Sequence, residues 1–184
     1  MRNKFKTQWL ACLVAVCLSG GYANAATDKP VENPTNELSK VKVTWQDPAA
    51  YRDIRPSNES RKGFRNRVFK SLSKYLNELA EALPQNETLS LTVTDLDLAG
   101  EVWPTMRGGA ADIRVVDTLY FPRMEFSYEL KQGDKVVKSA QVDLKEMAFM
   151  NRISRARSND ALRYEKDMLK RWFDEEFQDT LAKN

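Results

Sequence analysis

The sequence predicts a two-layer α+β domain, in which a long helix and a C-terminal helix pack on an antiparallel or mixed sheet of about four to five strands. Two stretches, over residues 57–83 and near the C-terminus, have the three- and four-residue apolar spacing of amphipathic helices. Several shorter stretches alternate apolar and polar side chains, which is typical of strands with one buried face. Because these strands mostly follow one another directly, we expect both helices on one face of the sheet.

The first 25 residues have the pattern of a cleavable signal peptide. Three basic residues open the chain, an apolar run follows from Trp9 to Leu18, and small residues stand at Ala23 and Ala25. We expect cleavage after Ala25 and export to the periplasm of a Gram-negative bacterium. The apolar run is shorter than the roughly 20 residues of a membrane span, so the mature protein should be soluble.

The composition excludes several kinds of chemistry. Histidine is absent, and both cysteines, Cys12 and Cys17, lie in the leader, where they fit a lipoprotein anchor poorly. The mature chain therefore lacks histidine bases, Cys/His zinc sites, thiol nucleophiles and disulfides, and we expect no cofactor. Three of the 29 basic residues lie in the leader, so the other 159 residues carry 26 basic and 26 acidic side chains. A net charge of zero gives no support for a nucleic-acid partner.

Residues 26–40 are polar, contain Pro30 and Pro34, and show no apolar period, which predicts a disordered tether ahead of a single domain over residues 41–184. Alternation from Val41 to Trp45 then predicts a strand with one buried face.

The long helix is predicted from apolar residues that recur between Phe64 and Leu83. Ser57, Asn58 and Ser60 are all competent N-caps, and Pro84 ends the run.

A strand follows over residues 89–94. Its apolar phase slips at Asp95, which predicts a bulge near Thr94-Asp95. Residues 101–111 contain several glycine and proline signals and are interpreted as a mobile loop, before a short strand over residues 113–116.

Alternation over residues 124–130 and 136–144 predicts a β-hairpin. If its two apolar sets share one face, Leu130 lies opposite Val136 with a loop of about three to five residues, and a two-residue Gly133-Asp134 turn is excluded. Caps over residues 158–160 then precede the last helix, whose apolar stripe ends at Leu181.

Asp95, Asp97 and Glu101 form an acidic group that could hold a divalent cation or act as a catalytic carboxylate pair. Their spacing resembles the start of a calcium loop but fails at Ala99 and Met106, where further ligands belong. We favour a structural interpretation, in which these acids end a strand and pair with arginines.

Basic residues crowd the start of the long helix, among them Arg55, Arg61 and Arg65. Cations there oppose the helix dipole, so something negative should lie nearby. Our hypothesis is that these arginines lie against Asp95 and Asp97, either as an internal ion-pair network, which we favour, or as the rim of a site for an anionic ligand.

Arg152, Arg155 and Arg157 form a second basic patch ahead of the last helix. It could meet an anionic partner such as a membrane surface or another protein. We interpret it first as a solvated connection.

Several stretches together resemble a proteobacterial family of exported proteins, the domain of unknown function 3016. They are Val41–Trp45 with Asp47-Pro48, Arg55–Ser57, Leu91–Glu101, Asp112–Val116, Tyr120–Arg123, Tyr128–Leu130, Leu162–Lys166 and Trp172-Phe173. The resemblance implies a single periplasmic domain without an assigned activity, and it supplies no catalytic residues.

We therefore expect a non-catalytic binding or accessory module of the cell envelope, whose partner is an envelope protein or an anionic ligand and not nucleic acid. Nothing in the sequence requires an enzyme. Two alternatives stay open: a carboxylate-dependent hydrolase acting on cell-wall glycan, and a divalent-cation-binding protein.

Overall fold

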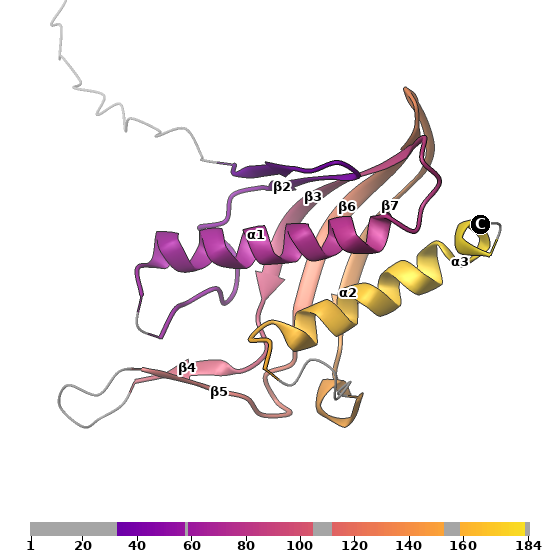
Figure 1. Ribbon diagram of the computed structural model, residues 1–184. Helices are drawn as coiled ribbons and strands as arrows, with labels where there is room; N and C mark the ends of the chain where they lie inside the picture. Colours follow the sequence, from indigo (N-terminus) through magenta and orange to yellow (C-terminus); the bar gives the residue numbers. More distant parts are fainter. Residues whose placement is uncertain (1–32, 58, 105–111, 153–158, 183–184) are drawn as a thin grey trace, which may run out of the picture. The chain divides into compact units, whose positions relative to one another are not determined.

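The computed structural model describes residues 33–57, 59–104, 112–152 and 159–182 (Figure 1). All of them belong to one compact unit that runs from Val31 to Asn184. In chain order its elements are β1 (Thr35–Glu37), β2 (Val41–Trp45), α1 (Arg61–Ala80), β3 (Glu87–Asp97), β4 (Glu101–Trp103), β5 (Ile113–Val115), β6 (Arg123–Gln132), β7 (Lys135–Lys145), the 3-10 helix η1 (Phe149–Arg152), α2 (Arg163–Glu176) and α3 (Gln178–Leu181).

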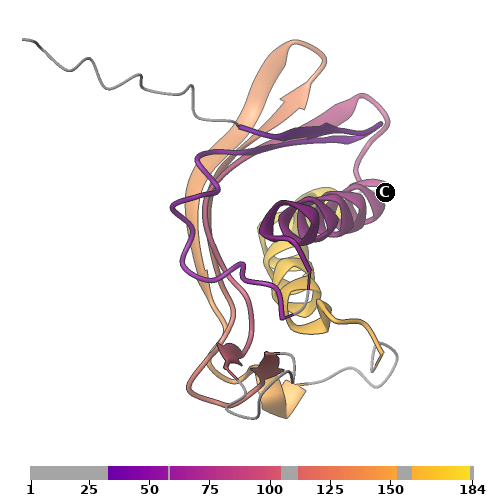
Figure 2. The ribbon, with the colours of Figure 1, turned by 90° about the vertical axis from the view of Figure 1, so that its left-hand side faces the viewer.

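The main sheet has five strands in the order β1-β2-β3-β6-β7, and β4 and β5 form a separate two-stranded sheet. β2 and β3 run parallel, whereas the other neighbouring strands are antiparallel, so the main sheet is mixed. The sheet bends around α1 and α2, which both lie on its concave face (Figure 2). The predicted α+β fold, with a long helix and a C-terminal helix on one mixed sheet, is therefore confirmed.

The core fills the space between this concave face and the two helices. Trp45 of β2 stacks on Phe69 of α1 with 4.1 Å between ring centroids, and Trp172 of α2 meets Phe126 of β6 edge-on at 4.8 Å. Alternate side chains of β3 and β6 are buried against the helices: Leu89, Leu91, Val93, Met124, Phe126, Tyr128 and Leu130. The predicted alternation of these strands therefore corresponds to real burial.

Helix α1 begins later and ends earlier than the predicted span of residues 57–83. Ser60 is the N-cap, and its hydroxyl accepts a hydrogen bond from the backbone N–H of Gly63 at 3.1 Å. Beyond Ala80 the chain makes a turn in which Leu83 donates its backbone N–H to Ala80. Leu83 is buried there, so its place in the apolar pattern reflects burial outside the helix.

The tether predicted over residues 26–40 is wrong at its end, because Thr35–Glu37 forms strand β1. Pairing with β2 satisfies the backbone of this polar segment, which needs no apolar face of its own. The side-chain carbonyl of Asn36 also accepts a hydrogen bond from the indole N–H of Trp45 at 3.0 Å. Residues 1–32, which include the predicted signal peptide, lie outside the described residues.

The loop predicted over residues 101–111 is also wrong at its start, since Glu101–Trp103 forms β4 and pairs with β5. The turn before β4 requires a glycine: Gly100 has a φ of +85°, and a Cβ there would lie 2.5 Å from the carbonyl oxygen of Val115. Residues 105–111 lie outside the described part of the chain.

The bulge predicted near Thr94-Asp95 is confirmed by a register shift between Val93 and Asp95 in the pairing of β3 with β6. The predicted hairpin between β6 and β7 exists, but its expected turn is wrong. Gln132 pairs with Lys135, which leaves the two-residue turn Gly133-Asp134. The alternation of apolar residues in the two strands had excluded this turn. Gly133 takes a φ of +57° in the turn.

A second bulge explains how Ala140, Val142 and Leu144 still lie opposite Tyr128, Phe126 and Met124, whereas Val136 pairs with Lys131. Leu130 pairs with Lys138, but the next residue, Lys131, pairs with Val136, so Val137 is the additional residue of β7. This single inserted residue shifts the register by one, so that apolar side chains of β6 and β7 lie on the same face of the sheet beyond the bulge.

The predicted last helix is present as α2, but the predicted caps over residues 158–160 are wrong, because Leu162 is the N-cap and makes no side-chain cap hydrogen bond. The helix also breaks at Phe177, after which the short helix α3 follows. The carboxylate of Asp160 accepts a hydrogen bond from the backbone N–H of Leu162 at 2.9 Å, just before α2 begins. In the described part of the chain, no helix has the length and apolar character needed to cross a membrane.

Candidate functional site

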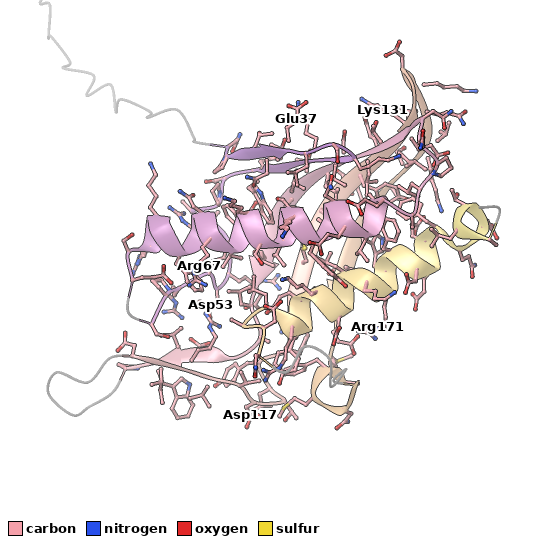
Figure 3. The ribbon with its side chains drawn as sticks, in the orientation of Figure 1. Glu37, Asp53, Arg67, Asp117, Lys131 and Arg171 are labelled. Atoms are coloured by element: carbon pink, nitrogen blue, oxygen red, sulfur yellow. The ribbon has the colours of Figure 1, made fainter. Side chains whose placement is uncertain are left out.

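A basic pocket lies where the connection from β2 to α1 passes the end of β3. It has a volume of about 320 Å³, and four arginines line it: Arg52, Arg55, Arg61 and Arg65. The connection is fixed to β3 by a bridge between Asp53 and Asp97. Figure 3 shows Asp53 below the first turns of α1 and above β4.

Arg52 is held by the acidic end of β3. Its Nε lies 3.2 Å from Oδ2 of Asp95, and its backbone N–H donates to Oδ1 of the same carboxylate at 3.0 Å. Its Nη2 lies 3.6 Å from Glu125 on β6. The bulge at Val93/Asp95 brings Asp95 into this pairing, because the strand changes phase there.

Arg55 is held by two acids from different segments. Its Nε donates to Oδ1 of Asp53 at 3.2 Å, and its Nη2 donates to Glu101 on β4 at 2.7 Å. The other oxygen of Asp53 lies 3.0 Å from Nη1 of Arg114 on β5. Asp53 therefore joins two arginines while its own side chain is only 7% exposed.

Arg61 and Arg65 stand four residues apart on α1 and so share one face of the helix. Arg65 donates from Nη1 to the backbone carbonyl of Pro48 at 3.1 Å. Neither arginine has a carboxylate partner among the described residues. The next arginine, Arg67, pairs with Glu59 outside this pocket.

The predicted arginine–acid network is therefore present in part, with different partners. The structure brings Arg55 to Glu101, whereas Asp95 pairs with Arg52, and Asp97 lies 3.8 Å from Arg123. The expected contact of Arg61 and Arg65 with Asp95 and Asp97 is not among the described ion pairs. Each of the three acids lies within 4 Å of an arginine, as the favoured interpretation expected, but Glu101 begins β4 and does not end a strand.

The two alternatives that used these acids gain no support from their positions. Among the described residues, no group of three or more acidic side chains is arranged to hold a metal ion. None of the five described pockets is lined by Asp95 or Asp97, as a carboxylate pair acting on glycan would require.

Sequence reasoning missed three buried or nearly buried charged residues, Asp53, Arg114 and Glu165. Arg114 donates from Nη1 to the backbone carbonyl of Gly100 at 2.7 Å and from Nη2 to that of Arg55 at 3.1 Å. It therefore ties the turn before β4 to the connection that carries the pocket. Isolated charged residues in a sequence carry no signal of burial, so only the fold reveals them.

Glu165 of α2 is 1% exposed, and its Oε1 accepts a hydrogen bond from the backbone N–H of Ala99 at 2.8 Å. Burial raises its pKa to about 7, despite the opposing effects of that hydrogen bond and of Arg114. Burial likewise raises the pKa of Asp97 to about 6, although Arg123 opposes the shift. Both carboxyls lie around the end of β3, since Asp97 is its last residue and Glu165 contacts Ala99 two residues further on.

The second predicted basic patch is described only at its edge. Arg152 is the last residue of η1, and Arg155 and Arg157 lie outside the described residues. Its role as a partner site therefore stays a prediction.

Comparisons with known proteins agree with the resemblance seen in the sequence. No curated protein and no solved structure matches the chain. One family model matches residues 39–175, a span that contains the whole main sheet except β1, the arginine pocket and the junction around Asp53. The chain therefore belongs to the family described as protein of unknown function (DUF3016).

Proposed function

We propose that the protein is an exported, non-catalytic binding module of the bacterial cell envelope that holds an anionic ligand in the arginine pocket. One observation carries the proposal: four arginines line one pocket, while the neighbouring acids pair with only two of them, Arg52 and Arg55. The export step rests on the leader pattern of residues 1–25.

The electrostatics of the pocket favour an anion. The first turn of α1 contains no acidic residue, and the N-terminus of a helix already carries a partial positive charge. Arg61, the first residue of the helix, adds a cation to this end at a cost of about 0.3–1 kcal/mol when exposed, and Arg65 adds a second cation one turn later. A bound anion would remove this cost, since the acids on β3 are already engaged elsewhere.

The geometry suits a planar or tetrahedral anion. A guanidinium group can donate two parallel hydrogen bonds to a carboxylate or a phosphate. The pairs of Arg52 with Asp95 and of Arg55 with Glu101 hold two of these groups in place before a ligand arrives. Such preorganisation lowers the entropy lost on binding.

The remaining lining supports binding rather than turnover. Tyr51 lines the pocket, and its hydroxyl donates to the backbone carbonyl of Val93 at 2.8 Å. Burial, followed by the charges of Asp95 and Asp47, raises the pKa of this phenol above its usual value. Tyr51 therefore stays neutral and is suited to shape the pocket, not to remove a proton.

The test is calorimetric titration of the mature protein with phosphate, pyrophosphate and citrate at low ionic strength. We expect binding of at least one of these anions, weakened by salt. Arg61→Gln and Arg65→Gln should each reduce affinity by tenfold or more, since a hydrogen bond to a charged group contributes about 1.5–3 kcal/mol.

The matched control is Arg67→Gln, which makes the same change in the same helix outside the pocket lining. It should leave affinity within about twofold. The proposal fails if the native protein binds none of these anions, or if the control variant loses as much affinity as the two pocket variants.

A further inference from the structure

A second pocket adjoins the arginine pocket on the same helix. It has a volume of about 210 Å³, and it shares Pro48, Ala49 and Arg65 with the arginine pocket. The arginine pocket alone lies near the lower end of the roughly 300–1,000 Å³ range of small-molecule sites, and the second pocket lies beside it. A ligand that reaches both pockets is larger than an inorganic ion.

The two pockets differ in chemistry. The arginine pocket is lined by four guanidinium groups and no acid, whereas the second pocket adds the carboxylate of Asp47 and the amide of Asn66 to the cations Lys62 and Arg65. Carboxylate and amide oxygens accept hydrogen bonds from hydroxyl groups. Pro34 and Phe69 add apolar surface to the second pocket, which suits the C–H groups of a ring.

The charges of the two linings favour one direction for a ligand. Four arginines and no acid line the arginine pocket, whereas Lys62, Arg65 and one carboxylate line the second pocket, so an anionic group is favoured in the arginine pocket. The carboxylate of the second pocket is that of Asp47. Its backbone has a φ of +45°, a left-handed conformation that aspartate tolerates better than most residues. The bond from its backbone N–H to the side-chain carbonyl of Asn33 at 2.7 Å holds it there.

We infer that the ligand is a sugar that carries an anionic group, with its charge in the arginine pocket and its hydroxyl groups in the pocket of Asp47 and Asn66. This inference rests on the proposed function, and it names the class of ligand. A phosphate and a carboxylate would meet the same guanidinium groups, so the shared chemistry is an anionic group attached to a polyhydroxyl ring.

The experiment compares inorganic phosphate, glucose 6-phosphate, glucuronate and glucose by calorimetric titration of the mature protein. We expect an anionic sugar to bind at least tenfold more tightly than inorganic phosphate, and glucose to bind weakest. Preference for glucose 6-phosphate or for glucuronate identifies the anionic group.

Variants separate the two pockets. Asn66→Ala should reduce the affinity for the anionic sugar about fivefold and leave that for inorganic phosphate unchanged. The control is Lys70→Ala, one turn further along α1 and outside both pockets, which should change neither.

Two negative outcomes are distinguishable. If inorganic phosphate binds as tightly as both anionic sugars and Asn66→Ala has no effect, the inference about the sugar is overturned while anion binding stands. If none of the anions binds, the proposed function itself fails.

Discussion

The apolar core under the helices and the charged junction at the end of β3 stabilise the same fold in different ways. In the core, rings such as Trp45 and Phe69 stack on each other, and the burial of apolar surface provides the free energy. At the junction, Asp53, Arg114 and Glu165 connect three segments through ion pairs and hydrogen bonds. The core should therefore be insensitive to pH, whereas the junction should respond to it.

The largest effect is expected from a change in the core. Phe173 of α2 is 1% exposed and lies 4.9 Å from the ring of Phe177. Phe173→Ala should lower the free energy of unfolding by about 3–5 kcal/mol, because it removes buried contacts and leaves a cavity. Denaturant titration measures this loss, and Asp174→Ala at the exposed neighbouring position is the control. A loss below about 1 kcal/mol would contradict the described core.

The next effect is the pH dependence of the junction. The pKa of Glu165 is raised from 4.5 to about 7, so its contribution to stability is complete below pH 4.5 and is lost as the pH rises to 7. The loss is on the order of 3 kcal/mol. Asp97 should add a loss of the same sign between pH 3.8 and 6.

Glu165→Gln isolates this contribution, since the amide oxygen can still accept the hydrogen bond of Ala99 and does not ionise. The difference in melting temperature between native protein and variant should shift in favour of the variant from pH 4.5 to 7. Parallel curves over this range would show that Glu165 does not titrate as described.

A smaller effect is expected when one junction ion pair loses its charge. Asp53→Asn keeps an oxygen for the backbone N–H of Arg55 but removes the charge that faces Arg114. We expect a loss of about 1.5–3 kcal/mol by denaturant titration. Glu101→Gln, at the more exposed pair with Arg55, should cost less than about 1 kcal/mol. Equal losses would mean that burial does not distinguish the two pairs.

The fold could be predicted from the sequence wherever burial follows a period. The alternation of Val41–Trp45 and of β3 reports one buried face directly, and the phase slip at Asp95 located a real bulge. Strand β1 could not be predicted, because it pairs through its backbone and has no apolar face. The turn of the hairpin was predicted wrongly, because the prediction assumed the same register along the whole hairpin, whereas the additional residue Val137 shifts it by one.

For the candidate site, the sequence predicts which kinds of residue gather there but not which of them are partners. The excess of arginines near the start of α1 is visible in the sequence, but their partners depend on how the connection from β2 to α1 crosses the sheet. Asp95 faces Arg52 and not Arg61 for this reason. Glu165 meets Ala99 across 66 residues of chain, a contact that no local pattern encodes.

The bulge at Val137 has a consequence for how the molecule avoids unwanted assembly. β7 is the outer strand of the main sheet, and a long straight outer strand would offer its backbone as a template to other chains. The additional residue twists this margin, and the charged side chains of Lys135, Lys138 and Lys145 lie along it, the last two paired with Glu176 and Asp143. Removing Val137 would keep every cross-strand partner of β7 and should straighten its margin, so we expect the variant without Val137 to aggregate more readily than the native protein.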